Sequence, residues 1–123
     1  MPNPTLLVIE DDDMVLNLVT LFLEAAGHSD YVAVGGAKGA REMWEAHRDS
    51  LRLVVSDMTL PDGSGVELVR EFLGENKEAR AVLMTGYTAE YVELGAEINK
   101  RSVLLQKPFT RDEFTRIVKA CLR

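Results

Sequence analysis

The sequence has little cysteine and little histidine: one cysteine, Cys121, and two histidines in 123 residues, with no cluster at zinc-ligand spacing. A lone cysteine cannot form a disulfide within the chain, so a disulfide-stabilised secreted fold is excluded and a reducing cytoplasm is expected. A chain of this length buries roughly two thirds of the surface that its unfolded form exposes, which is enough for one core without disulfides or a structural metal. We therefore expect a single globular domain over residues 1–123.

Long apolar runs are also missing. The longest, such as residues 6–9 and 81–84, contain four residues, and no basic segment followed by an apolar stretch begins the chain. The sequence therefore predicts no membrane span and no signal peptide. Lysine and arginine are scattered along a chain whose net charge is -6, which argues against direct nucleic-acid binding. Any contact with DNA would belong to another chain or segment.

Five short apolar runs predict strands, at residues 5–9, 31–34, 53–56, 81–84 and 103–106. All of them are short and rich in valine and leucine, and they lack the alternation of a sheet that is exposed on one face. Such strands are typical of a parallel sheet covered by helices on both faces. Right-handed crossovers between successive parallel strands then give a doubly wound α/β domain.

Stretches with helical spacing of apolar residues separate these runs and predict five helices. The first is expected to end at Gly27. The second is expected over about residues 37–48, and the fourth over about residues 88–98, where Gly95 weakens it. The third and fifth are expected to begin at capping boxes, Ser64-x-x-Glu67 and Thr110-x-x-Glu113.

Acidic residues follow two of the predicted strands, at the edge where open α/β sheets bind their ligands. Glu10 and Asp11 follow the first strand and Asp57 follows the third, so adjacent parallel strands would bring three carboxylates together. At ~4 Å and an effective dielectric constant of ~20, each like-charged pair costs about 4 kcal/mol. The cluster should therefore hold a proton or bind a cation, and hard oxygen ligands favour Mg²⁺, with Mn²⁺ or Ca²⁺ as substitutes. For Asp12 or Asp13 we expect a simpler role, the capping of the first helix.

A metal beside Asp57 would let this carboxylate attack a phosphoryl group, because the incoming oxygens need to be neutralised. Lys107, which precedes Pro108 after the fifth strand, offers a second positive charge to a phosphate oxygen. Thr85, after the fourth strand, offers a hydroxyl donor. Together, the acids, the hydroxyl and the lysine are what a magnesium-assisted phosphoryl acceptor requires.

These strand ends resemble those of the response-regulator receiver domains of bacterial two-component signalling, and the resemblance covers essentially the whole chain. It rests on four motifs in order, LVIED at residues 7–11, DMTLPDGSG at 57–65, MTGY at 84–87 and KPF at 107–109. The resemblance implies a flavodoxin-like (βα)5 three-layer sandwich with five parallel strands in the order 2-1-3-4-5. It also implies that residues 1–123 form one receiver domain.

The resemblance further implies a role for each site residue. Asp57 would accept a phosphoryl group from the phosphohistidine of a histidine kinase or a histidine phosphotransfer domain. The protein ligands of Mg²⁺ would be Asp11 directly, Glu10 through water, Asp57, and the backbone carbonyl of Thr59. Thr85 and Lys107 would respond to the phosphorylation state. Such a domain is a signalling phosphoacceptor in a phosphorelay, with self-phosphorylation and self-dephosphorylation chemistry only, and is not classed as an enzyme.

One position departs from the family pattern. Receivers usually have tyrosine or phenylalanine three residues before the lysine, where this sequence has Leu104, so the coupled inward turn of threonine and ring cannot occur in that form. Residues 104–109 and 85–87 are similar to those of receivers joined to hybrid sensor histidine kinases, which often have an irregular fourth helix. We expect phosphorylation to reorganise the loop after Thr85 and the fourth helix.

Two other functions fit parts of this pattern. A Mg²⁺-dependent phosphohydrolase with an aspartyl-phosphate intermediate would use the same acids, but it requires a second catalytic carboxylate two residues after the nucleophile, where Thr59 stands. Flavin or nucleotide binding at this edge expects a first loop rich in glycine or hydroxyl groups, and the acids from Glu10 to Asp13 would repel phosphate. The sequence therefore favours the phosphoacceptor hypothesis.

Overall fold

The computed structural model describes residues 3–86 and 95–122 of the chain. Five parallel strands form its main sheet: β1 (Leu6–Ile9), β2 (Tyr31–Val34), β3 (Leu53–Asp57), β6 (Arg80–Thr85) and β7 (Ser102–Gln106). The strand order β2-β1-β3-β6-β7 is the predicted order 2-1-3-4-5, because β6 and β7 are the fourth and fifth strands of this sheet. The predicted fold class is therefore confirmed.

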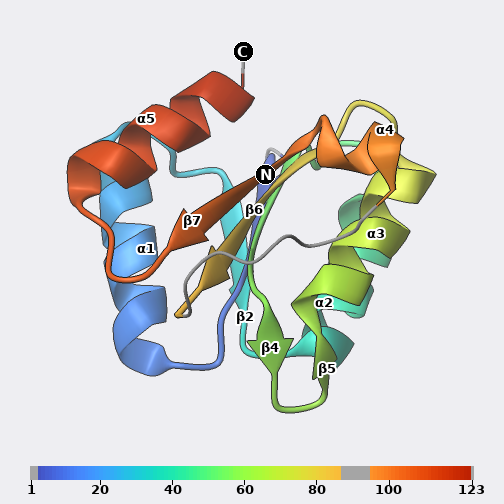
Figure 1. The fold of residues 1–123 in the computed structure, drawn as a ribbon, viewed down its shortest axis with the longest axis horizontal. Coiled ribbons are helices and arrows are strands. Elements are labelled where there is room, and N and C mark those ends of the chain that lie inside the picture. The colour runs from blue at the N-terminus through green and yellow to red at the C-terminus, as the bar shows by residue number, and fades with distance from the viewer. Residues whose placement is uncertain (1–2, 87–94, 123) are drawn as a thin grey trace.

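Helices cover both faces of the sheet, with α1 and α5 on one face and α2 and α3 on the other (Figure 1). The helices are α1 (Asp13–Ala25), α2 (Ala37–His47), α3 (Gly65–Glu75), α4 (Ala96–Asn99) and α5 (Arg111–Cys121). Of the predicted fourth helix, only its last part is described, as α4, and residues 87–94 lie outside the described ranges. In the part of the chain that the structure describes, no helix is both long and apolar enough to cross a bilayer.

Successive residues of a strand point to opposite faces of the sheet, and in the central strands these faces form two hydrophobic cores. In β1, Leu7 and Ile9 face the core under α2 and α3, whereas Leu6 and Val8 face the core under α1 and α5. All four side chains are fully buried. Because the sheet has no solvent-facing side here, β1 is apolar at every position, and polar residues begin only where the strand ends.

The helix ends follow the local signals in the sequence. The hydroxyl oxygens of Ser64 and Thr110 accept hydrogen bonds from the backbone amides of Glu67 and Glu113, at 3.3 and 3.0 Å, so both residues are N-caps as predicted. Gly27 follows the end of α1 with a φ of 91°, in the left-handed region where glycine is favoured. Ser64 and Thr110 thus end loops at the carboxyl edge of the sheet, whereas Gly27 lies in a loop at the opposite edge.

A short antiparallel hairpin follows β3, and the sequence analysis did not predict it. Its strands are β4 (Thr59–Leu60) and β5 (Gly63–Ser64), with Thr59 paired to Ser64 and Leu60 paired to Gly63. Leu60 is buried in the core under α2 and α3. The hairpin therefore holds the residues after Asp57 in a defined conformation at the carboxyl edge (Figure 1).

Gly65, the first residue of α3, provides a test of this local packing. A Cβ atom at this position would overlap the carbonyl oxygen of Asp57 and would lie 2.7 Å from Ser56 Oγ. We expect Gly65→Ala to lower the free energy of unfolding by about 1–3 kcal/mol or more, measured by urea denaturation. Gly74→Ala in the same helix is the matched control, because a Cβ there meets no atom within 4 Å. Equal destabilisation by both substitutions would contradict this account.

Candidate functional site

The five residues singled out at the strand ends lie at one edge of the sheet. Glu10 and Asp11 directly follow β1, and Asp57 and Thr85 are the last residues of β3 and β6. Lys107 directly follows β7. The parallel register sets β1 beside β3, β3 beside β6 and β6 beside β7, so the carboxyl ends of these four strands are neighbours. The structure thus places all five residues where the sequence predicted them.

The three carboxylates form a cluster in which each offers an oxygen, and these oxygens all lie within 4.8 Å of one another. Their burial differs: Glu10 is only 1% exposed, Asp57 is half-buried, and Asp11 is exposed. Carboxylate oxygens around an open position are the ligands that Mg²⁺ prefers, and Mg²⁺ usually keeps several of its waters. The donor set of Glu10, Asp11 and Asp57 therefore fits a divalent cation of this kind.

Lys107 supplies a positive charge to the cluster. Its Nζ lies 3.3 Å from Glu10 Oε2 and 3.3 Å from Asp57 Oδ1, so one ammonium pairs with two carboxylates. The backbone amide of Lys107 donates to the carbonyl of Thr85 at 2.7 Å, and the peptide bond between Lys107 and Pro108 is cis. Thr85 itself is 5% exposed. The ends of β6 and β7 are therefore joined directly beside the acids.

The charge on Glu10 is only partly compensated. Burial raises the pKa of the Glu10 carboxyl above its ordinary value, and the negative charge of Asp57 raises it further. The ammonium of Lys107 and the backbone amide of Asp12, which donates to Glu10 Oε1 at 3.3 Å, act in the opposite direction. Because the pKa is raised despite these two donors, the ionised form of Glu10 would be favoured by an additional cation.

The backbone around Asp57 is held by several hydrogen bonds. The amide of Met58 donates both to Asp57 Oδ1 and to the carbonyl of Met84, each at 3.0 Å. Ser56, a buried residue that the sequence analysis did not single out, donates from its hydroxyl to the carbonyl of Asp57 at 2.8 Å. The signal in the sequence was a lone polar residue inside an apolar strand. These bonds orient the Asp57 side chain before any ligand binds.

Three further residues of the prediction lie close by. Thr59 is exposed in β4, two residues beyond Asp57. Asp12 is the N-cap of α1, and its Oδ1 accepts from the amides of Met14 and Val15 at 2.9 and 3.3 Å. Of the two acids expected to cap this helix, Asp12 therefore does so, whereas Asp13 is the first residue of the helix itself.

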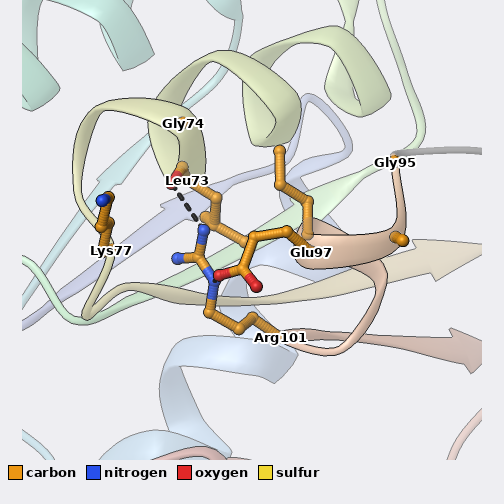
Figure 2. A pocket seen from close by; sticks show the side chains of 8 residues that line it. Leu73, Gly74, Lys77, Gly95, Glu97 and Arg101 are labelled. Atoms are coloured by element: carbon orange, nitrogen blue, oxygen red, sulfur yellow. Dashed lines mark hydrogen bonds and ion pairs between the residues drawn. The ribbon is translucent and has the colours of Figure 1, made fainter.

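A separate cavity of about 510 Å³ lies between the end of α3 and α4 (Figure 2). Figure 2 shows the guanidinium of Arg101 directed at the carbonyl of Leu73, a hydrogen bond of 2.8 Å, and Arg101 Nε is paired with Glu97 at 3.2 Å. Arg101 directly precedes β7, so this cavity is at the edge of the sheet opposite to the acidic cluster. Its charged groups brace α3 and α4 and resemble no phosphoryl or metal site.

The comparison with protein families agrees with this geometry. The model of the response regulator receiver domain matches residues 6–119. The chain therefore belongs to the response regulator receiver domain family, which serves two-component signalling.

Curated relatives come from more than one kind of signalling protein. The chain is 26% identical over 120 residues, 98% of its length, to the sensor kinase CckA of Brucella abortus. It is 29% identical over 118 residues, 96% of its length, to the regulatory protein VanRB of Enterococcus faecalis. The chain spans 13% of the first of these proteins and 52% of the second.

Solved structures share the fold. The receiver domain of the hybrid histidine kinase CckA has a TM-score of 0.79 and 22% identity, and the match covers 96% of this chain and 98% of that one. A CheY-like receiver domain protein from Methanospirillum hungatei has a TM-score of 0.80 and 21% identity, and the match covers 98% and 94% of the two chains. At these identities the likeness establishes the fold.

The buried charge of Glu10 leads to a prediction for the metal-free protein. With EDTA at pH 7, Glu10→Gln should raise the melting temperature by a few degrees, because it removes a desolvated charge beside Asp57 with little change of shape. Added Mg²⁺ should reduce or reverse this gain by stabilising the wild type more. Glu42→Gln, at an exposed position of α2, is the control. A lower melting temperature of Glu10→Gln in EDTA would show that pairing with Lys107 outweighs the cost of burial.

The different positions of Asp11 and Asp13 lead to a second prediction. Asp11→Ala should raise the dissociation constant for Mg²⁺ sharply, because it removes one of the three clustered carboxylates. Asp13→Ala should change this constant little, because Asp13 lies in the first turn of α1 and outside the cluster. Isothermal titration calorimetry measures both constants. Equal effects of the two substitutions would remove the distinction between them.

Proposed function

We propose that this domain is the phosphoacceptor of a two-component phosphorelay and that Asp57 accepts the phosphoryl group from the phosphohistidine of a histidine kinase or a histidine phosphotransfer domain. The observation that carries the proposal is the position of Asp57 Oδ1. The Asp57 carboxylate offers one oxygen to a cluster with Glu10 and Asp11 in which the three oxygens lie within 4.8 Å of one another, and its Oδ1 lies 3.3 Å from the ammonium of Lys107. A nucleophilic carboxylate needs such positive charge nearby, because the incoming phosphoryl oxygens are negative.

The transfer is a simple exchange of bonds. An oxygen of the Asp57 carboxylate forms a P–O bond while the N–P bond of the donor's phosphohistidine breaks, and the released imidazole takes a proton from solvent. Asp11, Asp57 and the Thr59 carbonyl would hold Mg²⁺ directly and Glu10 would hold it through water, and the bound ion would supply positive charge to the phosphoryl oxygens. Mn²⁺ and Ca²⁺ offer the same hard-ligand chemistry.

Two residues respond to the phosphorylated state. Lys107 Nζ is already within 3.3 Å of Asp57, so a phosphoryl group on that carboxylate falls within reach of its flexible side chain. Thr85 ends the neighbouring strand and offers its hydroxyl to another phosphoryl oxygen. The hydrogen bond from the backbone amide of Lys107 to the carbonyl of Thr85 makes the two responses interdependent.

A phosphohydrolase is the alternative, and the residues after Asp57 argue against it. That enzyme class requires a second catalytic carboxylate two residues beyond its nucleophile, and Thr59 stands there in β4. Lys107, which follows β7, places its ammonium 3.3 Å from Asp57, and an ammonium cannot replace the missing carboxylate as general acid or base. The proposed role is therefore transfer and storage of a phosphoryl group, with self-phosphorylation and self-dephosphorylation as its only chemistry.

We assign residues 1–123 to one receiver domain that acts in the cytoplasm as part of a larger signalling system. Support comes from relatives of two kinds, a sensor kinase and a regulatory protein, each longer than this chain. Leu104 packs against the core under α2 and α3. Because this position is leucine and not tyrosine, no phenol can move into space vacated by Thr85. The readout of phosphorylation therefore rests on Thr85 and Lys107, and most of the loop after β6 that is expected to reorganise lies outside the described residues.

Asp57→Asn tests the proposal directly. The variant keeps the size of the side chain but removes the attacking carboxylate, so it should fold normally and gain no phosphoryl adduct from acetyl phosphate and Mg²⁺. Intact-mass spectrometry of the wild type should show an adduct that is stable to acid and labile to base. Circular dichroism provides the folding control. Phosphorylation of Asp57→Asn at the wild-type rate would show that another residue is the acceptor.

A further inference from the structure

The tip of the hairpin after β3 is attached to the start of α2. Asp62 lies in the turn between β4 and β5, and its Oδ1 accepts from the amide of Ala37 at 2.7 Å. Its Oδ2 accepts from the amide of Lys38 at 3.1 Å. One exposed carboxylate thus binds the first two amides of a helix that begins 25 residues earlier in the chain.

This contact replaces a local helix cap. The N-cap residue of α2 is Gly36, which has no side chain to accept from the amides that follow. The two amide donors also hold the pKa of the Asp62 carboxyl below its ordinary value. Asp62 is therefore the side-chain cap of α2, supplied from the loop that follows the phosphoacceptor.

The hairpin between Asp57 and α3 is fixed at two points. At its base, the amide of Gly65 donates to the carbonyl of Met58 at 2.9 Å. At its tip, Asp62 is bonded to α2. Thr59 lies between these two points and is itself exposed, so its backbone position depends on both attachments and on the burial of Leu60.

From this arrangement we infer that Asp62 is a positioning residue for the metal site: by binding the N-terminus of α2 it holds β4 so that the Thr59 carbonyl is preorganised toward the acidic cluster. The inference rests on the proposed function, in which that carbonyl is a Mg²⁺ ligand. It adds a residue that binds neither metal nor phosphoryl group, and it makes the start of α2 part of the support of the site.

The close approach of α2 to the hairpin provides a second way to break the contact. A Cβ atom at Gly36 would lie 2.7 Å from Asp62 Oδ1, so Gly36→Ala would push the carboxylate away while keeping its charge. The neighbouring Gly35 has nothing within 4 Å of its Cβ position. Gly35→Ala is therefore the matched control for replacing a glycine before α2 by alanine. Asp112→Ala, in the first turn of α5, is the control for loss of an exposed acid.

The experiment measures the dissociation constant for Mg²⁺ by calorimetry, the rate of phosphorylation by acetyl phosphate at saturating Mg²⁺, and the melting temperature in EDTA. Asp62→Ala and Gly36→Ala should each raise the Mg²⁺ dissociation constant about 10-fold, the lower end of what loss of a residue supporting a metal ligand costs. The phosphorylation rate at saturating Mg²⁺ should stay close to that of the wild type, because Asp57 and Lys107 are untouched. Both control variants should keep the wild-type constant.

Each result decides between distinct conclusions. A lower melting temperature with an unchanged Mg²⁺ dissociation constant in both variants would show that Asp62 only caps α2, and it would overturn the inference. If Asp62→Ala fails to fold, Gly36→Ala decides the question alone. Absence of phosphorylation of the wild type on Asp57 would instead overturn the proposed function, so the two failures are distinguishable.

Discussion

The close approach of three carboxylates at the carboxyl edge of the sheet is the constraint on which the rest of the site depends. Glu10, Asp11 and Asp57 have oxygens within 4.8 Å of one another, and Lys107 pairs with only two of these carboxylates. Such an arrangement is electrostatically unfavourable until a cation or a proton joins it, so the chain around it has to be rigid enough to hold the acids together. The fold provides the rigidity, because each of these residues directly ends or follows a strand of one parallel sheet. Strand pairing therefore fixes where the backbone presents the acids.

Rigidity at Asp57 has a second source in the contact between β3 and α3. Gly65 lies so close to the Asp57 carbonyl that only glycine fits there, and the buried Ser56 hydroxyl donates to the same carbonyl. Asp57 is thus held from the strand side by sheet pairing and from the helix side by the start of α3. A glycine and a serine that take no part in the chemistry therefore hold the backbone that carries the carboxylate.

The sequence predicted the main strands and the residues at the edge from local patterns: continuous apolar runs, capping boxes and acids directly after a run. The order of the strands came from the resemblance to receiver domains, because no local pattern specifies which strands are neighbours. The sequence did not predict the hairpin of β4 and β5, whose paired segments of two residues each are too short to show alternation. It also missed the cap of α2, since Asp62 and Ala37 are 25 residues apart and nothing near Gly36 in the sequence indicates a distant acceptor. The cap of α1 could be narrowed to Asp12 or Asp13, and only the structure identified Asp12.

In the proposed function, Lys107 connects this static arrangement to a response. A ligand shifts a conformational equilibrium only if it makes different contacts in the two states, and a phosphoryl group on Asp57 would offer Lys107 a new partner in place of a carboxylate oxygen. Because the Lys107 amide is bonded to the Thr85 carbonyl at 2.7 Å, a change in the partners of the ammonium is passed to the end of β6 through the backbone. Leu104 packs against the core under α2 and α3, and its apolar side chain cannot form a hydrogen bond to phosphate. In the proposed function the differential contacts therefore belong to Thr85 and Lys107, at the ends of two neighbouring strands beside the acids.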